Sequence, residues 1–266
     1  MRLRQENAPS LPFFWVIMTV TADEILNTLA AQLRRGLEQG FITLVTYGRG
    51  QARRESTENE EIIGNSLRAF AAGHPWFQED LTFSVATNGA WYDFLVESPD
   101  GRVWMPINLK VSNLQGDDNV ASKAGLFYAM TGLRPTNSAI RNWDVFCENL
   151  ATHLRRENCA SDYYFLVVEK SAAGVGRVFW TSLLHLRSVT PNGSNPPFQA
   201  CWRQNIERSD RARSEAVDYL LNVVGQTFVL RAKALQSFKN HIVPKLSTEL
   251  RTEWIGDGPL VEGESA

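Results

Sequence analysis

Apolar residues recur at helical spacing in several parts of the chain. Between residues 22 and 38, leucines stand three or four positions apart, and Thr21 or Asp23 can cap the helix that this spacing predicts. The same periodicity predicts a helix at about 58–72, which Pro75 ends because proline cannot continue a helical hydrogen-bond ladder. Further helices are predicted at about 119–130, 138–156, 209–223 and 228–241.

Shorter apolar runs between turn-forming residues predict strands. They cover residues 41–47, 81–86, 91–97, 103–111, 162–169, 176–184 and 198–204. The sequence Ser98-Pro99-Asp100-Gly101 is typical of a tight turn, since Pro sets one backbone φ and Gly adopts the left-handed one. We therefore expect an α/β fold in which 81–86, 91–97 and 103–111 are adjacent strands and 162–169 joins the same sheet.

Length and composition favour one domain over residues 1–266. The 266 residues are 44% hydrophobic, enough for one sizeable core, and no internal repeat or long linker divides them. We expect residues 255–266 to be a frayed tail. The apolar segment 11–18 is short, contains Pro12 and precedes no clear cleavage site, which disfavours a signal peptide. Residues 1–17 are better interpreted as a first core strand, or as an extension ahead of a native start at Met18.

The charge and the cysteines narrow the class of protein. The net charge of −2 and pI of about 6.1 mean that any surface for nucleic acid must be local. No segment approaches the roughly 18 apolar residues of a membrane span. The three cysteines lack metal-binding spacing, which disfavours a zinc site and favours a reduced, intracellular setting.

The candidate chemistry lies on the predicted hairpin. Strand alternation puts Asn108 and Lys110 on one face, and the turn brings Asp93 back toward them. A carboxylate, an amide oxygen and an ammonium group would then converge at one end of a sheet. Mg²⁺ prefers such oxygen ligands, and a nearby lysine can orient water or stabilise developing negative charge. These residue types indicate Mg²⁺-dependent phosphodiester hydrolysis.

An aspartate on one strand of a hairpin, with Asn108-Leu109-Lys110 on the next, resembles the motif of the PD-(D/E)xK nuclease superfamily. The resemblance covers about residues 58–132 and implies a restriction-endonuclease-like core, with a mixed central sheet flanked by helices. It implies cleavage of double-stranded DNA. Some type II restriction endonucleases have a similar Pro-Ile-Asn-Leu-Lys string followed by Ser, which here is Ser112.

The resemblance also implies a further acid, because the helix before the strands often supplies a Glu. Glu60 or Glu61 could fill this role, and we assign Glu61 with Asp93 and Asn108 as metal ligands. Asn108 departs from the family's usual carboxylate. One fewer negative charge weakens cation affinity and leaves open a catalytically inactive family member.

Candidate DNA contacts lie around and beyond this motif. Ser112 follows it, and Lys123 would stand near the start of a helix that Asp118 or Asn119 can cap, where a phosphate could bind. Residues 170–206 contain no Asp or Glu but hold the cations and amides that contact phosphates and base edges. The candidates there are Arg187, Asn192, Asn195, Arg203, Gln204 and Asn205. Trp180 and Trp202 are interpreted as core residues.

Three alternatives remain beside a type II restriction endonuclease. They are a repair or recombination nuclease of the same fold, an inactive DNA-binding relative, and an unrelated α/β protein. The chain has no G-x-S-x-G, P-loop or G-x-G-x-x-G motif, so no nucleotide cofactor is expected. We expect double-stranded DNA as partner, a homodimer on symmetry grounds, no membrane association, and a cytoplasmic location in a bacterial or archaeal cell.

Overall fold

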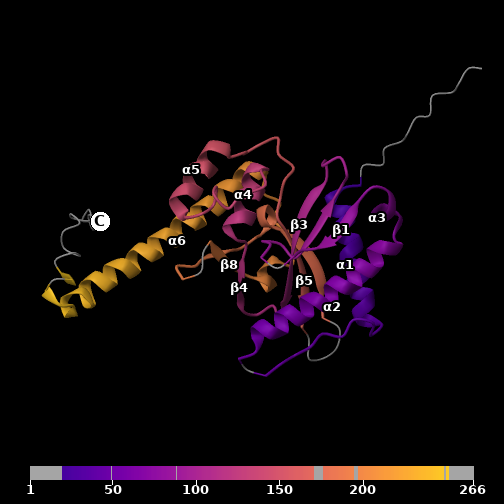
Figure 1. Ribbon diagram of the computed structural model, residues 1–266, viewed down its shortest axis with the longest axis horizontal. Helices are drawn as coiled ribbons and strands as arrows, with labels where there is room; N and C mark the ends of the chain where they lie inside the picture. The colour runs from indigo at the N-terminus through magenta and orange to yellow at the C-terminus, as the bar shows by residue number, and fades with distance from the viewer. Residues whose placement is uncertain are drawn as a thin grey trace, which may run out of the picture.

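A five-stranded mixed sheet forms the centre of the molecule (Figure 1). Its order is β1-β2-β3-β5-β6, with β3 and β5 parallel and the other neighbours antiparallel. The strands are β1 (Thr82–Val85), β2 (Phe94–Glu97), β3 (Trp104–Ser112), β5 (Tyr164–Glu169) and β6 (Val178–Ser182). The predicted α/β class and the predicted adjacency of these strands are confirmed.

The computed structural model describes residues 20–48, 50–87, 89–170, 176–194, 197–248 and 250–251. The expectations for residues 1–17, for a start at Met18, for Asn195 and for the tail at 255–266 lie outside these residues. None of the described helices combines the length and apolarity that a membrane span requires.

Helices cover both faces of the sheet. On one face, α1 (Ala22–Glu38) and α2 (Ala52–Gly73) bury a core against Ile107 and Leu109 of β3. Thr21 caps α1 as predicted, because its hydroxyl oxygen accepts the Glu24 N–H at 3.3 Å. The short helix α3 (Pro75–Glu79) begins at the proline that ends α2.

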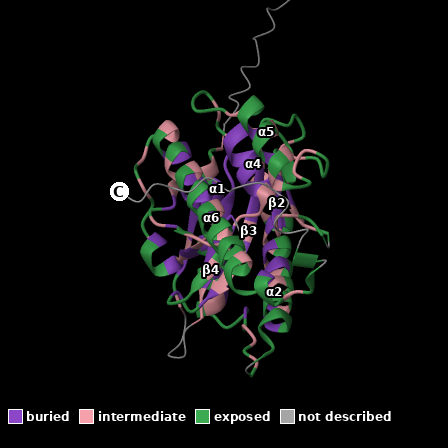
Figure 2. Cartoon of the chain, turned by 90° about the vertical axis from the view of Figure 1, so that its left-hand side faces the viewer, coloured by how far each residue is buried: buried purple, intermediate pink, exposed green. Residues whose placement is uncertain are grey.

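A second core fills the opposite face. It joins α4 (Lys123–Thr131), α5 (Trp143–His153), the start of α6 (Arg213–His241) and a small antiparallel sheet. That sheet has the order β4-β8-β7 and consists of β4 (Asp117–Val120), β8 (Phe198–Cys201) and β7 (Thr190–Pro191). Trp180 and Trp202 are buried, as predicted. Figure 2 shows buried residues gathered in the central strands and α4, whereas the outward faces of α2 and α6 are exposed.

The predicted strand at 41–47 is wrong. This segment pairs with no strand, because side chains of α2 satisfy its backbone instead. The Asn59 amide accepts from Val45 N at 2.8 Å and donates to Val45 O at 3.0 Å. Glu55 accepts from Tyr47 N at 2.8 Å. A polar helix face thus substitutes for a neighbouring strand.

Several predicted helix boundaries are also wrong, since α2 begins at Ala52 rather than about 58, and α5 covers Trp143–His153 rather than 138–156. The helix expected from about 119 begins at Lys123, because residues 117–120 pair with β8 as strand β4. Ser122, rather than Asp118 or Asn119, caps α4 by accepting from Gly125 N at 3.2 Å. The helices expected at 209–223 and 228–241 are one helix, α6, which runs through Gly225.

Candidate functional site

The β2–β3 hairpin places Asp93 beside Asn108. Phe94 of β2 pairs with Ile107 of β3, so the residues on either side of this pair are neighbours across the two strands. Asp93 N donates to Ile107 O at 2.9 Å, and an Asp93 carboxylate oxygen accepts from Leu109 N at 2.6 Å. These two bonds hold the carboxylate against the middle of β3, as the hairpin pattern predicts.

Asn108 and Lys110 share one face of β3. They alternate with the buried Ile107 and Leu109, which face α1 and α2. Both therefore face the α4 side of the sheet. Lys110 also lies close enough to Asp93 for its positive charge to lower the pKa of that carboxyl. The carboxylate, the amide and the ammonium group therefore meet at one place.

The side-chain oxygen of Asn108 is buried and has no hydrogen-bond partner. A buried acceptor left unpaired costs about 1–3 kcal/mol, so such atoms are rare in folded proteins. A cation is one partner that an amide oxygen can take, and Asn108 stands opposite Asp93 across the hairpin. Asn108 therefore fits the expected metal-ligand role as an oxygen donor.

Burial raises the pKa of the Asp93 carboxyl to about 6. The negative charge of Glu60 raises this pKa further, whereas the Leu109 N–H and the charge of Lys110 lower it. A bound cation would favour the ionised carboxylate, because opposite charge stabilises the charged form. In the Asp93 carboxyl, the effect of burial thus outweighs that of the nearby positive charge of Lys110.

Glu60, rather than Glu61, is the acid of α2 near the site. Its charge acts on Asp93, and its carboxylate accepts from the Ser56 hydroxyl at 2.8 Å. Glu61 is exposed and is not among the groups that shift the Asp93 pKa. The assignment of Glu61 as the third acid is therefore corrected to Glu60, since adjacent helix residues point in directions about 100° apart.

Among the residues that the structure describes, no three His, Cys, Asp or Glu side chains gather as a metal-binding group. A cation at the hairpin would depend on the Asn108 oxygen in addition to Asp93 and Glu60. The donor set of two carboxylates and one amide oxygen suits a hard cation such as Mg²⁺, which retains several waters in protein sites.

Two residues expected to contact DNA are buried instead. Ser112 is 6% exposed, and its hydroxyl accepts from Leu114 N at 3.2 Å. Asn205 is 0% exposed, and its amide bonds Ser188 N, Ser188 O and Cys201 O. Both side chains hold turns of the backbone, so their assignment as DNA contacts is corrected.

The other described candidates for DNA contact differ in whether their side chains already bind other residues. Lys123 donates to Arg141 O at 3.0 Å and lies over the Trp143 ring, so it supports a helix start rather than facing a phosphate. Arg187 pairs with Glu207, and Asn192 bonds Asn119. Arg203 and Gln204 are exposed.

Two buried residues near the site, Tyr163 and Glu55, were not among the predicted site residues. Tyr163 is 1% exposed, stands just before β5 and donates its hydroxyl hydrogen to Trp91 O at 2.7 Å. Glu55 is buried and forms an ion pair with Lys170, which follows β5. Tyr163 sits in an apolar run that indicated only a buried strand, and Glu55 sits among other charged residues. Neither position carried a local signal.

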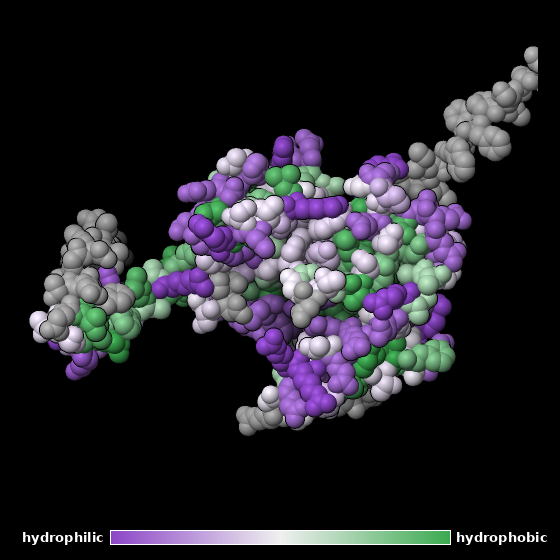
Figure 3. Space-filling model, viewed as in Figure 1, coloured by the Kyte–Doolittle hydropathy of each residue, from purple (hydrophilic) through white to green (hydrophobic). Residues whose placement is uncertain are grey.

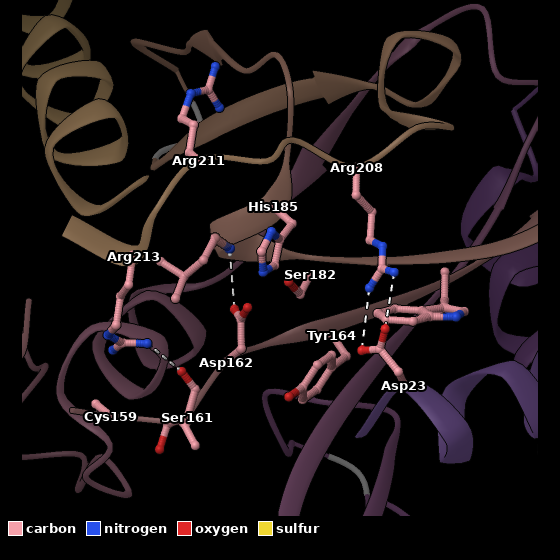
Figure 4. A pocket seen from close by; sticks show the side chains of 13 residues that line it. Asp23, Cys159, Ser161, Asp162, Tyr164, Ser182, His185, Arg208, Arg211 and Arg213 are labelled. Atoms are coloured by element: carbon pink, nitrogen blue, oxygen red, sulfur yellow. Dashed lines mark hydrogen bonds and ion pairs between the residues drawn. The ribbon is translucent and has the colours of Figure 1, made fainter. Parts of the chain in front are cut away.

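A separate cavity of about 250 Å³ lies where β5, β6 and the start of α6 meet (Figure 4). Three arginines line it, but each is engaged. Arg208 pairs with Asp23, and Arg211 donates to two backbone carbonyls. Arg213 donates to the carbonyls of Arg155, Ser161 and Ala129. The cavity thus marks a structural junction, and its guanidinium groups are not free to bind an anion.

Neither a scan against protein-family models nor a search of curated proteins finds a match to this chain.

Proposed function

We propose that this protein is a Mg²⁺-dependent nuclease of the PD-(D/E)xK type that hydrolyses phosphodiester bonds in double-stranded DNA. The observation that carries the proposal is the unpaired, buried oxygen of Asn108 beside Asp93 and Lys110. Within that class, we propose a type II restriction endonuclease that acts at a short sequence as a homodimer inside a bacterial or archaeal cell. These finer assignments rest on the motif and on the symmetry of a palindromic target.

The residues divide the chemistry between them. Asp93, Asn108 through its oxygen, and Glu60 would hold Mg²⁺ next to the scissile phosphate. When bound, the cation would neutralise phosphate charge and favour hydroxide formation from a coordinated water. Lys110 would orient that water and stabilise negative charge developing on the phosphate. The Leu109 N–H keeps the Asp93 carboxylate aligned while this occurs.

Cleavage of plasmid and linear double-stranded DNA, with and without Mg²⁺, tests the proposal. We expect Mg²⁺-dependent cleavage, reduced about 100-fold or more in Asp93→Ala and in Lys110→Ala while DNA binding largely survives. Asp80→Ala and Lys245→Ala are the matched controls, since they remove the same charges at exposed positions elsewhere on the chain. Full activity in Asp93→Ala would show that the proposed site is wrong. Discrete fragments with uniform ends would support the restriction enzyme, and random cuts a repair or recombination nuclease.

One observation favours an inactive DNA-binding relative as the second candidate. The described residues contain no group of three His, Cys, Asp or Glu side chains that could hold a metal. Such a protein would bind DNA without cleaving it at any Mg²⁺ or Mn²⁺ concentration, in an assay where binding is measured beside cleavage. An absence of both binding and cleavage would exclude both candidates.

A further inference from the structure

The Tyr163 side chain spans the strand that carries Asn108. Tyr163 stands before β5 and Trp91 before β2, and β3 lies between these strands in the sheet. The Tyr163 hydroxyl nevertheless reaches Trp91 O, at 2.7 Å. Its ring packs on Trp91 and Phe165, and Phe165 is the residue of β5 that pairs with Asn108. The hydroxyl group is therefore fixed over β3 close to Asn108.

The position of Tyr163 is held from several directions. Asp162 accepts from Tyr163 N at 2.8 Å and from Leu184 N at 3.2 Å, which anchors the backbone at the start of β5. From the α4 side, Gly125 leaves room for the ring, because a Cβ there would lie 2.8 Å from two ring carbons. The hydroxyl cannot move away from Asn108 without disturbing these contacts.

The hydrogen-bond chemistry then sets the orientation of the Asn108 amide. The only hydroxyl hydrogen of Tyr163 goes to Trp91 O, so toward Asn108 the hydroxyl oxygen can only accept. Burial, and then the nearby charge of Asp93, raise the pKa of the Tyr163 hydroxyl well above its usual value, whereas the Asn108 side chain beside the hydroxyl lowers it. Toward an oxygen that can only accept, Asn108 can present only its amide nitrogen. Its oxygen therefore lies on the other side of the amide, and that oxygen is the buried atom without a partner.

This orientation matters because an asparagine can turn its amide over. The two orientations have nearly the same shape, but one presents an oxygen to a cation and the other presents two N–H donors. A carboxylate has an oxygen at both positions and needs no such control. A chain that has Asn where related motifs have an acid therefore needs a partner that selects the amide orientation.

We propose that Tyr163 is a positioning residue that holds the Asn108 amide with its oxygen toward the bound cation. The inference rests on the metal site of the proposed function, and it concerns cation affinity rather than cleavage.

Mg²⁺ and Mn²⁺ titrations, followed by calorimetry and by thermal melting, test it without using cleavage. In Tyr163→Phe we expect the metal concentration at half-saturation to rise about 10-fold, because roughly one hydrogen bond no longer selects the amide orientation. Asn108→Asp should bind metal at least as tightly as the wild type, since it keeps the oxygen and adds charge. The decisive measurement is the double variant. Tyr163→Phe should change the half-saturation less than about 2-fold in the Asn108→Asp background, where no amide needs orienting.

Tyr128→Phe is the matched control. Tyr128 is also a buried tyrosine that donates to a tryptophan carbonyl, at 2.7 Å to Trp104 O, and it stacks on the same aromatic cluster. Tyr128→Phe should lower the melting temperature about as much as Tyr163→Phe does, but it should leave the metal concentration at half-saturation unchanged. Melting in EDTA separates this loss of stability from metal binding.

Each remaining outcome has one meaning. An unchanged half-saturation in Tyr163→Phe, or an equal loss in the Asn108→Asp background, would overturn the inference and leave Tyr163 a packing residue. If the wild type binds no metal, or if Asn108→Ala binds it as well as the wild type, the inference is overturned together with the metal role of Asn108. Normal metal binding that depends on Tyr163, without DNA cleavage, would support the inference and contradict only the proposed nuclease.

Discussion

At the scale of single residues, the site combines two carboxylates with one amide. The Asp93 pKa is already raised to about 6 by burial and by the charge of Glu60. A third carboxylate at position 108 would add like-charge repulsion to the metal-free fold, because nearby negative charges disfavour ionisation. Asn108 supplies an oxygen without that repulsion. The disadvantage is that an amide, unlike a carboxylate, must be held in one orientation to present its oxygen.

The raised Asp93 pKa predicts how stability depends on pH. A carboxyl whose pKa is higher in the fold than in the unfolded chain contributes stability below about pH 4, and that stability is lost as pH rises through about 6. Asp93→Asn has no charge to bury and keeps an acceptor for Leu109 N. In EDTA it should therefore be more stable than the wild type at pH 7.5, by up to about 3 kcal/mol, and of similar stability at pH 4. Urea unfolding at both pH values is the measurement, with the exposed Asp80→Asn as control. An equal difference at both pH values would contradict the pKa assignment.

At the scale of elements, small residues let helices approach the strands of the site. Gly64 of α2 faces Phe94 of β2, where a Cβ would lie 3.2 Å from the ring. Gly125 of α4 faces the Tyr163 ring more closely, at 2.8 Å. The hairpin and the start of β5 are thus set by close contacts with α2 and α4. A larger side chain at either contact should therefore displace the residues of the site.

Gly125→Ala should destabilise the protein even though Ala is the better helix former. The propensity gain is about 1 kcal/mol, whereas overpacking against a buried ring costs about 1–3 kcal/mol. We expect a net loss of stability and a raised metal half-saturation, because the ring that carries the Tyr163 hydroxyl must shift. Gly225→Ala in α6 is the control. Gly225 is exposed with no atom near its would-be Cβ, so this change should stabilise by about 0.5–1 kcal/mol. Chemical denaturation compares the stability of the two variants. A gain in stability in both would show that the Tyr163 ring can accommodate a Cβ at position 125.

At the scale of the whole molecule, the second half of α6 projects away from the body (Figure 1). Most of residues 232–242 are exposed, and Leu235 and Ile242, seven positions apart, lie on one side of the helix. Figure 3 shows hydrophobic surface along this projecting end. An isolated stretch of about 12 helical residues is marginal in water. In the proposed homodimer, this apolar stripe offers a surface for the second copy.

Replacing the stripe should therefore weaken the proposed dimer. We expect the double variant Leu235→Gln and Ile242→Gln to sediment as a monomer at concentrations where the wild type is a dimer. Metal binding at the hairpin should be retained, since α6 leaves the body before this segment. Phe41→Ser with Leu133→Gln removes exposed apolar side chains elsewhere and should leave the association unchanged. A monomeric wild type at all concentrations would contradict the homodimer.

The sequence by itself determined the elements that local chemistry encodes. The turn residues between β2 and β3 predict the hairpin, because Gly101 adopts the positive φ of 74° that the turn requires. A side-chain period of two then puts Asn108 and Lys110 on one face wherever the strand lies. The helix over residues 22–38 and its cap follow from spacing within one or two turns. These predictions succeed because each depends on residues only a few positions apart.

Tertiary structure alone decided features that depend on distant residues. The segment at 41–47 is not a strand because the Asn59 side chain, 14 positions from Val45, satisfies its backbone. The choice of Glu60 over Glu61 depends on how α2 is rotated against the sheet. Tyr163 reaches Trp91 across 72 positions of sequence. No local periodicity encodes such contacts, because they form only after the helices and strands have packed and buried polar groups must find partners.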